Sequence, residues 1–267
     1  MNAFERFKEN AVSDYMDHRR FSEVKKTIEE EIAVRRGSNP YEAGGIGTLS
    51  EKTVHAVLKN YIEPDRDCHE VALDGFFADV FKDGQVTEIQ TAQFGKLRDK
   101  LSVFLNNYTI TVVYPVAVNK WISHIDGGKK SAFRMSPLHM NEYHAFEELY
   151  AIKSFLKNPN LRVHLYMMDM EEYKIKVQKR RRRRGSGYER FDRVPIGIRE
   201  IIEFNCTNDY LRVVPAELEE EFISSEFAAA AGISRSFASL VLNVLNEVGV
   251  VKRTGKRGRY YLYKTAY

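Results

Sequence analysis

The sharpest alternation of apolar and polar positions lies in residues 75–91, where two runs rich in aromatic and β-branched residues flank Asp83-Gly84. Asp-Gly favours the positive φ angles of a two-residue type I′ turn, so the pattern predicts a β-hairpin. Counting outward from the turn places Asp79 opposite Glu88 on one face of the hairpin. Their Cβ atoms would lie about 4.5–5.5 Å apart. Like charges at that distance call for a shared proton or a cation between them, which predicts a metal site.

The segments around the hairpin alternate between helical and strand patterns. Helical spacing of apolar residues predicts helices over residues 1–36, 50–61, 94–105 and 141–156, and runs of β-branched residues predict strands over 69–73, 108–118 and 161–168. Ser50 is expected to cap the second helix, and Pro115 is expected to mark a strand end or bulge. Residues 119–140 predict a loop or a small hairpin. Helices interleaved with strands predict an α/β layer architecture.

Residues 174–187 show the strongest change in composition, because they contain five consecutive arginines: Arg180, Arg181, Arg182, Arg183 and Arg184. Adjacent like charges repel, so the segment is expected to be a linker or an exposed arm. It could act as a solvated tether or contact the phosphate backbone of DNA, and we favour the DNA contact.

The C-terminal pattern predicts helix, turn and helix, followed by a strand, a basic tip and another strand. Ser224 or Ser225 is expected to cap the first helix, Gly232 to form the turn and Ser234 to cap the second helix. This order resembles a winged helix-turn-helix domain, whose second helix enters the major groove while the wing contacts phosphates. The resemblance implies DNA contacts by Ser234, Arg235, Ser236 and Ser239 on the second helix and by Arg253, Lys256, Arg257 and Arg259 on the wing. The alternative is a winged helix used for protein contacts or dimerisation.

Composition narrows the class of protein. The chain has 267 residues, of which 43% are hydrophobic and 29% are charged, with a net charge of +4. This suits one large domain or two small ones with a substantial core. We expect a cytoplasmic protein without membrane association, because no run of about 18 apolar residues, signal-peptide pattern or CxxC pair is present. The predicted domains are a charged helical segment over 1–44, a core over 45–173, a basic linker over 174–190 and a DNA-binding domain over 191–267.

Residues 45–170 resemble the PD-(D/E)xK, or restriction-endonuclease-like, superfamily. Its motif is an Asp, followed on the next strand by an acid, any residue and a Lys, with a helical Glu upstream. Asp79 matches the first acid, Glu88 the second and Glu51 the helical Glu, whereas Gln90 stands at the lysine position. The resemblance implies a restriction-endonuclease-like mixed sheet flanked by helices.

The implied chemistry is metal-assisted hydrolysis of phosphodiester bonds. Asp79, Glu88 and the backbone carbonyl of Ile89 would hold Mg²⁺, with Mn²⁺ as an alternative, and Glu51 would help with a second ion or a water. A glutamine at position 90 can orient water but adds no charge, so Lys96 or Lys100 of the following helix is a candidate substitute. The alternative is that Asp79 faces solvent while Glu88 pairs with a lysine.

The combined expectation is a Mg²⁺-dependent DNA endonuclease that a C-terminal winged helix targets to duplex DNA. A non-catalytic DNA-binding protein, or transcriptional regulator, that retains a nuclease-like scaffold is the alternative. The sequence leaves open whether the chain forms a homodimer.

Overall fold

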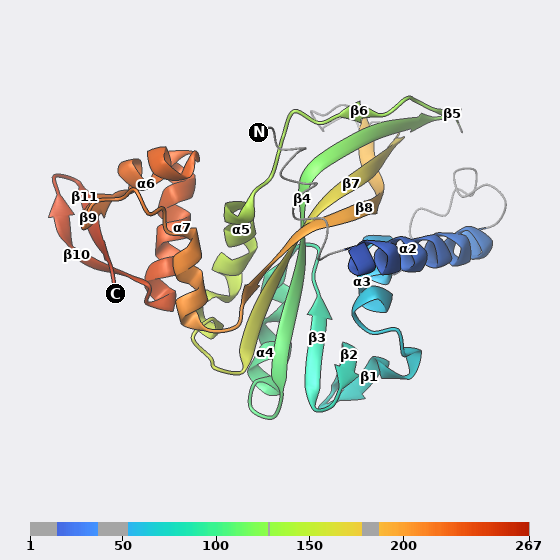
Figure 1. Cartoon of the computed structure of the whole chain (residues 1–267), viewed down its shortest axis with the longest axis horizontal. Helices are drawn as coiled ribbons and strands as arrows, with labels where there is room; N and C mark the ends of the chain where they lie inside the picture. Colours follow the sequence, from blue (N-terminus) through green and yellow to red (C-terminus); the bar gives the residue numbers. More distant parts are fainter. Residues whose placement is uncertain (1–14, 37–52, 128, 178–186, 267) are drawn as a thin grey trace. The chain divides into compact units, whose positions relative to one another are not determined.

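A computed structural model describes residues 15–36, 53–127, 129–177 and 187–266, which form a mixed α/β fold (Figure 1). The chain divides into two compact units. The first comprises residues 1–67, 117–139 and 167–200, and the second comprises residues 68–116, 140–166 and 201–267. The predicted α/β architecture is confirmed as a large mixed sheet flanked by helices.

The large sheet has the strand order β1-β2-β3-β4-β7-β8, and β5 and β6 also pair with β4. These strands are β1 (His69–Leu73), β2 (Phe76–Lys82), β3 (Gln85–Ile89), β4 (Thr109–Asp126), β5 (Lys129–Lys130), β6 (Arg134–Met135), β7 (Leu161–Lys176) and β8 (Tyr188–Phe204). Strands β1, β2 and β3 are antiparallel neighbours, whereas β3 and β4 run parallel. A parallel pair needs a crossover connection, and here a helical segment supplies it.

The hairpin of β2 and β3 has the predicted register. Lys82 pairs with Gln85 and Val80 with Thr87. Asp83 and Gly84 have φ angles of 49° and 74°, the signs that a type I′ turn requires. The prediction from the Asp-Gly dipeptide is therefore confirmed.

The connection from β3 to β4 is η2 (Phe94–Leu97), a 3₁₀ helix, followed by α4 (Arg98–Phe104). Phe94, Leu97, Leu101 and Leu105 are buried, so the helical spacing predicted the core-facing side correctly. Figure 1 shows α4 in the connection between β3 and β4.

Strand β4 is longer than predicted, because it continues through Pro115 to Asp126. Val113 accepts a hydrogen bond from the Gln90 N–H, so its carbonyl points toward β3. The backbone nitrogen of Pro115, two residues later, faces the same side as the Val113 carbonyl. At that point β3 has already ended, at Ile89. The missing N–H of Pro115 therefore removes no bond to that strand, and the predicted break does not occur. The predicted small hairpin after this strand corresponds to β4 with β5, where Ile125 pairs with Lys130.

The predicted helix over 141–156 is divided into three short pieces. They are η3 (Glu142–Ala145), α5 (Phe146–Leu149) and η4 (Tyr150–Phe155). Ile152 has a φ of −117°, which interrupts helical geometry inside η4. Phe146, Leu149 and Ile152 are nevertheless buried, as their spacing predicted.

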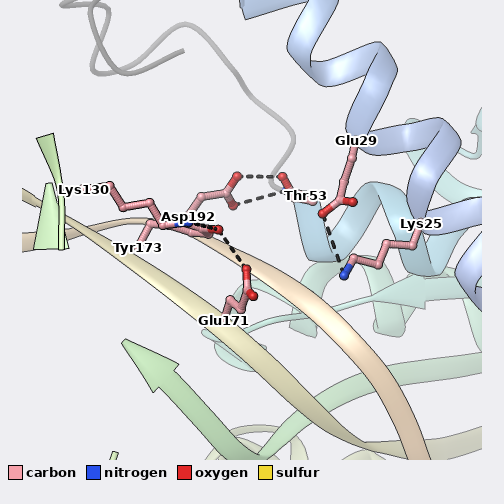
Figure 2. Close-up of polar contacts among 7 residues, drawn as sticks. All are labelled: Lys25, Glu29, Thr53, Lys130, Glu171, Tyr173 and Asp192. Atoms are coloured by element: carbon pink, nitrogen blue, oxygen red, sulfur yellow. Dashed lines mark hydrogen bonds and ion pairs between the residues drawn. The ribbon is translucent and has the colours of Figure 1, made fainter. Parts of the chain in front are cut away.

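In the first unit, α2 (Tyr15–Arg36) and α3 (Thr53–Ile62) are confirmed as helices, and the short 3₁₀ helix η1 (Arg66–Cys68) follows α3. Ser50, the expected cap of α3, lies outside the described residues. Asp192 of β8 accepts hydrogen bonds from the Thr53 Oγ1 at 2.6 Å and the Thr53 N–H at 3.4 Å, as Figure 2 shows. A second polar chain in Figure 2 runs from Lys130 to the Tyr173 hydroxyl and on to Glu171.

The C-terminal elements belong to the second unit. They are η5 (Thr207–Val213), β9 (Glu221–Ile223), α6 (Ser224–Ala231), α7 (Arg235–Val248), β10 (Val251–Arg257) and β11 (Tyr260–Thr265). The three strands form a separate sheet in the order β10-β11-β9. The predicted helix, turn and helix are confirmed, because the chain bends by 104° between α6 and α7, Gly232 has a φ of 65°, and the Ser234 side chain accepts from the Phe237 N–H.

The predicted cap of α6 is wrong. Ser224 is the first residue of the helix, and Ile223 occupies the cap position. The Glu226 carboxylate accepts the Ile223 N–H at 2.8 Å. A glutamate three residues into a helix can reach back in this way, so no serine is needed at the cap.

Two predicted domain boundaries differ from the strand limits. The boundary after residue 173 falls inside β7, and residues 191–204 belong to β8 of the large sheet. The Val177 N–H donates to the Gly187 carbonyl at 2.9 Å, so pairing continues on both sides of the basic segment. Among the described residues, no single helix is long and apolar enough to cross a bilayer, and only the bent pair α6 and α7 meets that test jointly.

Candidate functional site

The two hairpin acids lie on neighbouring strands of the second unit. The register of β2 and β3, extended by one pair beyond Val80 and Thr87, places Asp79 opposite Glu88. Asp79 is partly buried, and its Oδ2 accepts the Ile89 N–H at 2.7 Å. Glu88 is only 1% exposed. The hairpin therefore brings a buried and a partly buried carboxylate together.

A lysine from the crossover helix reaches this pair. The Nζ atom of Lys100 lies 2.7 Å from Glu88 Oε2 and 2.7 Å from the Phe77 carbonyl oxygen. Lys96, the other candidate, lies exposed in η2. Of the two expected lysines, Lys100 is thus the one that contacts an acid of the hairpin.

Burial and then the nearby Asp79 carboxylate raise the pKa of Glu88, while Lys100 lowers it, and the net result is a pKa of about 7. The Oε2 atom is satisfied by Lys100, but Oε1 is buried without a hydrogen-bond partner among the described residues. Leaving a buried acceptor unsatisfied is unfavourable, typically by about 1–3 kcal/mol. The Oε1 lone pairs are therefore available to a cation.

The donors suit a hard cation such as Mg²⁺. Carboxylate and carbonyl oxygens are its preferred ligands, and it keeps several waters. Because the N–H and C=O groups of one strand residue point to the same side, the Ile89 carbonyl is directed toward β2, as its N–H is toward Asp79. Among the described residues, no group of three or more His, Cys, Asp or Glu side chains that could hold a metal ion comes together.

The remaining predicted residues of the hairpin site are Gln90 and Glu51, and among the described residues no side-chain hydrogen bond joins Gln90 to either acid. Gln90 is partly buried directly after β3, and its N–H donates to the Val113 carbonyl at 2.9 Å. Glu51 lies outside the described residues. Sequence reasoning missed Glu148 of α5, whose Oε2 accepts the Phe94 N–H at 2.9 Å where η2 begins. Nothing in the local pattern indicated this contact, because the two residues are 54 positions apart.

The segment from η3 to η4 contacts both α4 and the C-terminal helices. The Arg98 guanidinium donates to the Ala151 carbonyl at 2.7 Å. The Lys153 ammonium donates to Asn243 of α7 at 2.6 Å, and the Tyr143 hydroxyl donates to the Val213 carbonyl at 3.0 Å. The segment from η3 to η4 thus contacts α4, which carries Lys100, and α7. Helix α7 is the second helix of the C-terminal module, which comprises β9, α6, α7, β10 and β11.

The expected DNA-contacting residues of α7 and the wing lie at the surface. The wing is the β10–β11 hairpin. The exposed residues are Ser234, Arg235, Ser236, Ser239, Arg253, Lys256, Arg257 and Arg259. Arg180, Arg181, Arg182, Arg183 and Arg184 lie outside the described residues.

Two tyrosines of β11 order most of these cations. The Arg235 and Arg259 guanidinium groups lie 3.9 and 5.1 Å from the centre of the Tyr260 ring. Arg253 and Lys256 lie 4.2 and 5.5 Å from the centre of the Tyr261 ring. Such stacking holds a cation in place without neutralising it. The basic residues in the first strand and turn of the wing, followed by tyrosines in the second strand, were the available sequence signal for these contacts.

Arg257 differs from the other wing cations. Its guanidinium contacts Glu226 of α6 at 2.6 Å and the Glu221 carbonyl at 3.2 Å. This residue therefore ties the wing to the first helix of the module.

Comparison with known proteins gives a family but no activity. The family model described as "Domain of unknown function (DUF8091)" matches residues 52–205, more than half of the chain. The chain is also similar to a protein of Treponema pallidum (strain Nichols) described as "Uncharacterized protein". The two are 28% identical over 228 residues, which cover 82% of this chain and 87% of the relative. No solved structure matches the chain.

Proposed function

The chain belongs to the family described as Domain of unknown function (DUF8091), and we propose that it is a Mg²⁺-dependent DNA endonuclease. One observation carries this proposal. The buried Glu88 carboxylate lies beside Asp79 on the hairpin and 2.7 Å from the ammonium group of Lys100. Two acids and a lysine in this arrangement are the functional groups of a PD-(D/E)xK nuclease.

The order of elements supports the same assignment. Strand β2 carries Asp79, β3 carries Glu88, and a helix leads into the buried parallel strand β4. This order is similar to that of the PD-(D/E)xK core. The sequence departs from the motif at Gln90, and Lys100 places a positive charge beside the second acid instead.

In the proposed reaction, different residues of the hairpin and of α4 would bind the metal, stabilise charge and orient water. Asp79, Glu88 and the Ile89 carbonyl would hold Mg²⁺, which lowers the pKa of bound water and stabilises charge on a phosphate. The Lys100 ammonium, held by Glu88 and the Phe77 carbonyl, supplies fixed positive charge where the phosphate becomes more negative. The Gln90 side chain offers an amide that can orient the attacking water.

The C-terminal elements support delivery to duplex DNA by a winged helix. A sheet in the order β10-β11-β9 beside two helices that meet at 104° is similar to that fold. In it, α7 would enter the major groove and the wing would contact phosphates. The exposed arginines and lysines stacked on Tyr260 and Tyr261 have the charge that this contact needs.

The test is cleavage of plasmid DNA by the full chain with and without Mg²⁺. We expect Asp79→Asn, Glu88→Gln and Lys100→Met each to reduce metal-dependent cleavage about 100-fold or more. Asp83→Asn is the matched control on the same hairpin, since asparagine also tolerates the positive φ of that position. Equal rates for the control and Asp79→Asn would contradict the proposal.

The alternative is a DNA-binding protein without catalysis. The Glu88–Lys100 ion pair favours it, because the lysine compensates one oxygen of the acid without any metal. It predicts salt-dependent DNA binding and no cleavage in Mg²⁺ or Mn²⁺. Nicking that Asp79→Asn abolishes would exclude this alternative.

A further inference from the structure

Phe77 is the most exposed large hydrophobic side chain among the described residues, at 64%. It lies on β2 two positions before Asp79, so both side chains project from the same face of the strand. Its partner in β1 is Ala72, which is too small to cover an aromatic ring. On the other side, the pairing of β2 with β3 ends at Val80 and Thr87, so Phe77 lies beyond the end of that ladder. The Phe77 ring is thus left open to solvent.

The position of Phe77 is fixed by its backbone. Its carbonyl accepts the hydrogen bond from Lys100, whose ammonium also contacts Glu88. The preceding residue, Phe76, packs edge-on against Phe104 of α4 at 5.9 Å and anchors the start of the strand. Two residues of a strand span about 6.6 Å, so the ring lies within one nucleotide's reach of Asp79.

A flat apolar ring beside a phosphate-cleaving site suits one part of a nucleic acid, the face of a base. In a paired duplex, each base face is covered by the neighbouring base pair. A base becomes available for stacking on a side chain only where the strand is unpaired or the nucleotide is displaced from the stack. Every base has such a face, so the contact selects structure more than sequence.

We propose that Phe77 stacks against an unpaired base next to the phosphate that is cleaved, and that the substrate is DNA with an unpaired strand adjoining a duplex. This inference rests on the proposed nuclease function and names its substrate class. The duplex part would contact the C-terminal module, and the unpaired nucleotide would lie on Phe77. Phe77 is then a specificity-determining residue of the site.

Binding tests the inference without cleavage. Glu88→Gln protein would be titrated with a duplex bearing an unpaired tail that contains 2-aminopurine, whose fluorescence is quenched when it stacks on a ring. We expect quenching, and we expect binding roughly 5- to 150-fold tighter than to the same DNA with an abasic site at that position, the equivalent of about 1–3 kcal/mol. Phe77→Ala and Phe77→Leu should remove both effects, and Phe77→Trp should restore them.

Phe133→Ala is the matched control, because Phe133 is another exposed phenylalanine, and it should leave both effects unchanged. Quenching and abasic discrimination that persist in Phe77→Ala would overturn the inference. A change of oligomeric state in Phe77→Ala, seen by sedimentation without loss of base discrimination, would also overturn it and assign the ring to a contact between copies.

Cleavage assays separate this inference from the proposed function. If the wild-type chain cleaves paired and tailed DNA and Phe77→Ala leaves the ratio of the two rates unchanged, only the inference fails. If base discrimination depends on Phe77 but no cleavage occurs in Mg²⁺ or Mn²⁺, the nuclease proposal fails while the stacking contact stands.

Discussion

Three influences act on the pKa of the Glu88 carboxyl group: burial, the Asp79 carboxylate and the Lys100 ammonium. Burial and the neighbouring Asp79 favour its neutral form, and Lys100 favours its charged form. Burial outweighs the lysine, and the result is a pKa of about 7 in place of 4.5. Groups with strongly shifted pKa values in polar clusters occur often at functional sites, which is consistent with the role proposed for Glu88.

This shift predicts how stability depends on pH in the absence of divalent ions. Between pH 4.5 and about 7, folded Glu88 holds a proton that the unfolded chain has lost. The free energy of unfolding should therefore fall as pH rises through this window, by on the order of 3 kcal/mol from this group. Urea unfolding of wild type and Glu88→Gln at pH 5 and pH 8 measures the difference, and the substitution should remove this part of the loss.

Glu147→Gln, at an exposed position of α5, is the matched control and should retain the wild-type dependence. A Glu88→Gln protein that loses as much stability between pH 5 and pH 8 as the wild type would contradict the assignment. Addition of Mg²⁺ should oppose the loss at pH 8, since the charged form of Glu88 is the one that binds a cation.

At this scale, local chemistry predicted part of the site. The Asp-Gly turn fixed which residues face one another, so Asp79 and Glu88 could be paired by counting. The choice between Lys96 and Lys100 could not be made in advance, because the crossover begins with a 3₁₀ turn that shifts the phase of the helix. The contact of Glu148 depends on packing between distant segments.

At the scale of elements, the start of η2 depends on a carboxylate from α5. Gln93, directly before η2, has a left-handed φ of 62°, and the following Phe94 N–H donates to Glu148. A residue other than glycine is strained in that region, so the contact helps to hold the turn that leads into the helix of Lys100.

Glu148→Ala should therefore destabilise the chain by about 1 kcal/mol, the usual effect of losing a side chain that caps a helix. Hydrogen exchange at the amide of Phe94 and through α4 should become faster, because the first turn of the crossover loses its acceptor. Glu148→Gln keeps an oxygen acceptor and should remain near wild type. Unchanged exchange in Glu148→Ala would show that the backbone alone holds this turn.

Element types were predicted better than element limits. The buried faces of residues 94–105 and 141–156 followed from spacing, because both segments pack one side on the core. The extension of β4 past Pro115 could not be predicted, since it depends on where the neighbouring strand β3 ends.

At the scale of the whole molecule, the β10–β11 wing stands out because it carries several lysines and arginines and no acidic residue. Arg253 and Arg259 are stacked on tyrosines but keep their charge exposed, whereas Arg257 is paired with Glu226. Free and paired cations should behave differently toward DNA, because only a cation that binds phosphate releases a counterion.

Arg253→Gln and Arg259→Gln should each reduce the slope of log Kd against log salt concentration by about 0.9 when the chain binds duplex DNA. Fluorescence anisotropy at several salt concentrations measures the slope. Arg257→Gln is the matched comparison and should leave it nearly unchanged. Equal reductions in all three variants would show that Arg257 leaves Glu226 when DNA binds.

The limits of the domains were the least predictable feature. The predicted DNA-binding domain began at residue 191, after the basic linker, yet residues 188–204 form β8 and extend the large sheet. Charge repulsion among the arginines carries no information on whether the strands on either side pair again, as the Val177 N–H and the Gly187 carbonyl do.

The ion pair of Glu88 and Lys100 also has a consequence for folding of the newly made chain. Carboxylates without a nearby cation repel one another, so a site built only of acids folds less readily when metal is absent. Lys100 supplies a positive charge from within the chain, 12 residues from Glu88. Under the proposed function, the chain would therefore fold without Mg²⁺, and the supply of free Mg²⁺ would chiefly set how many of the folded molecules are active.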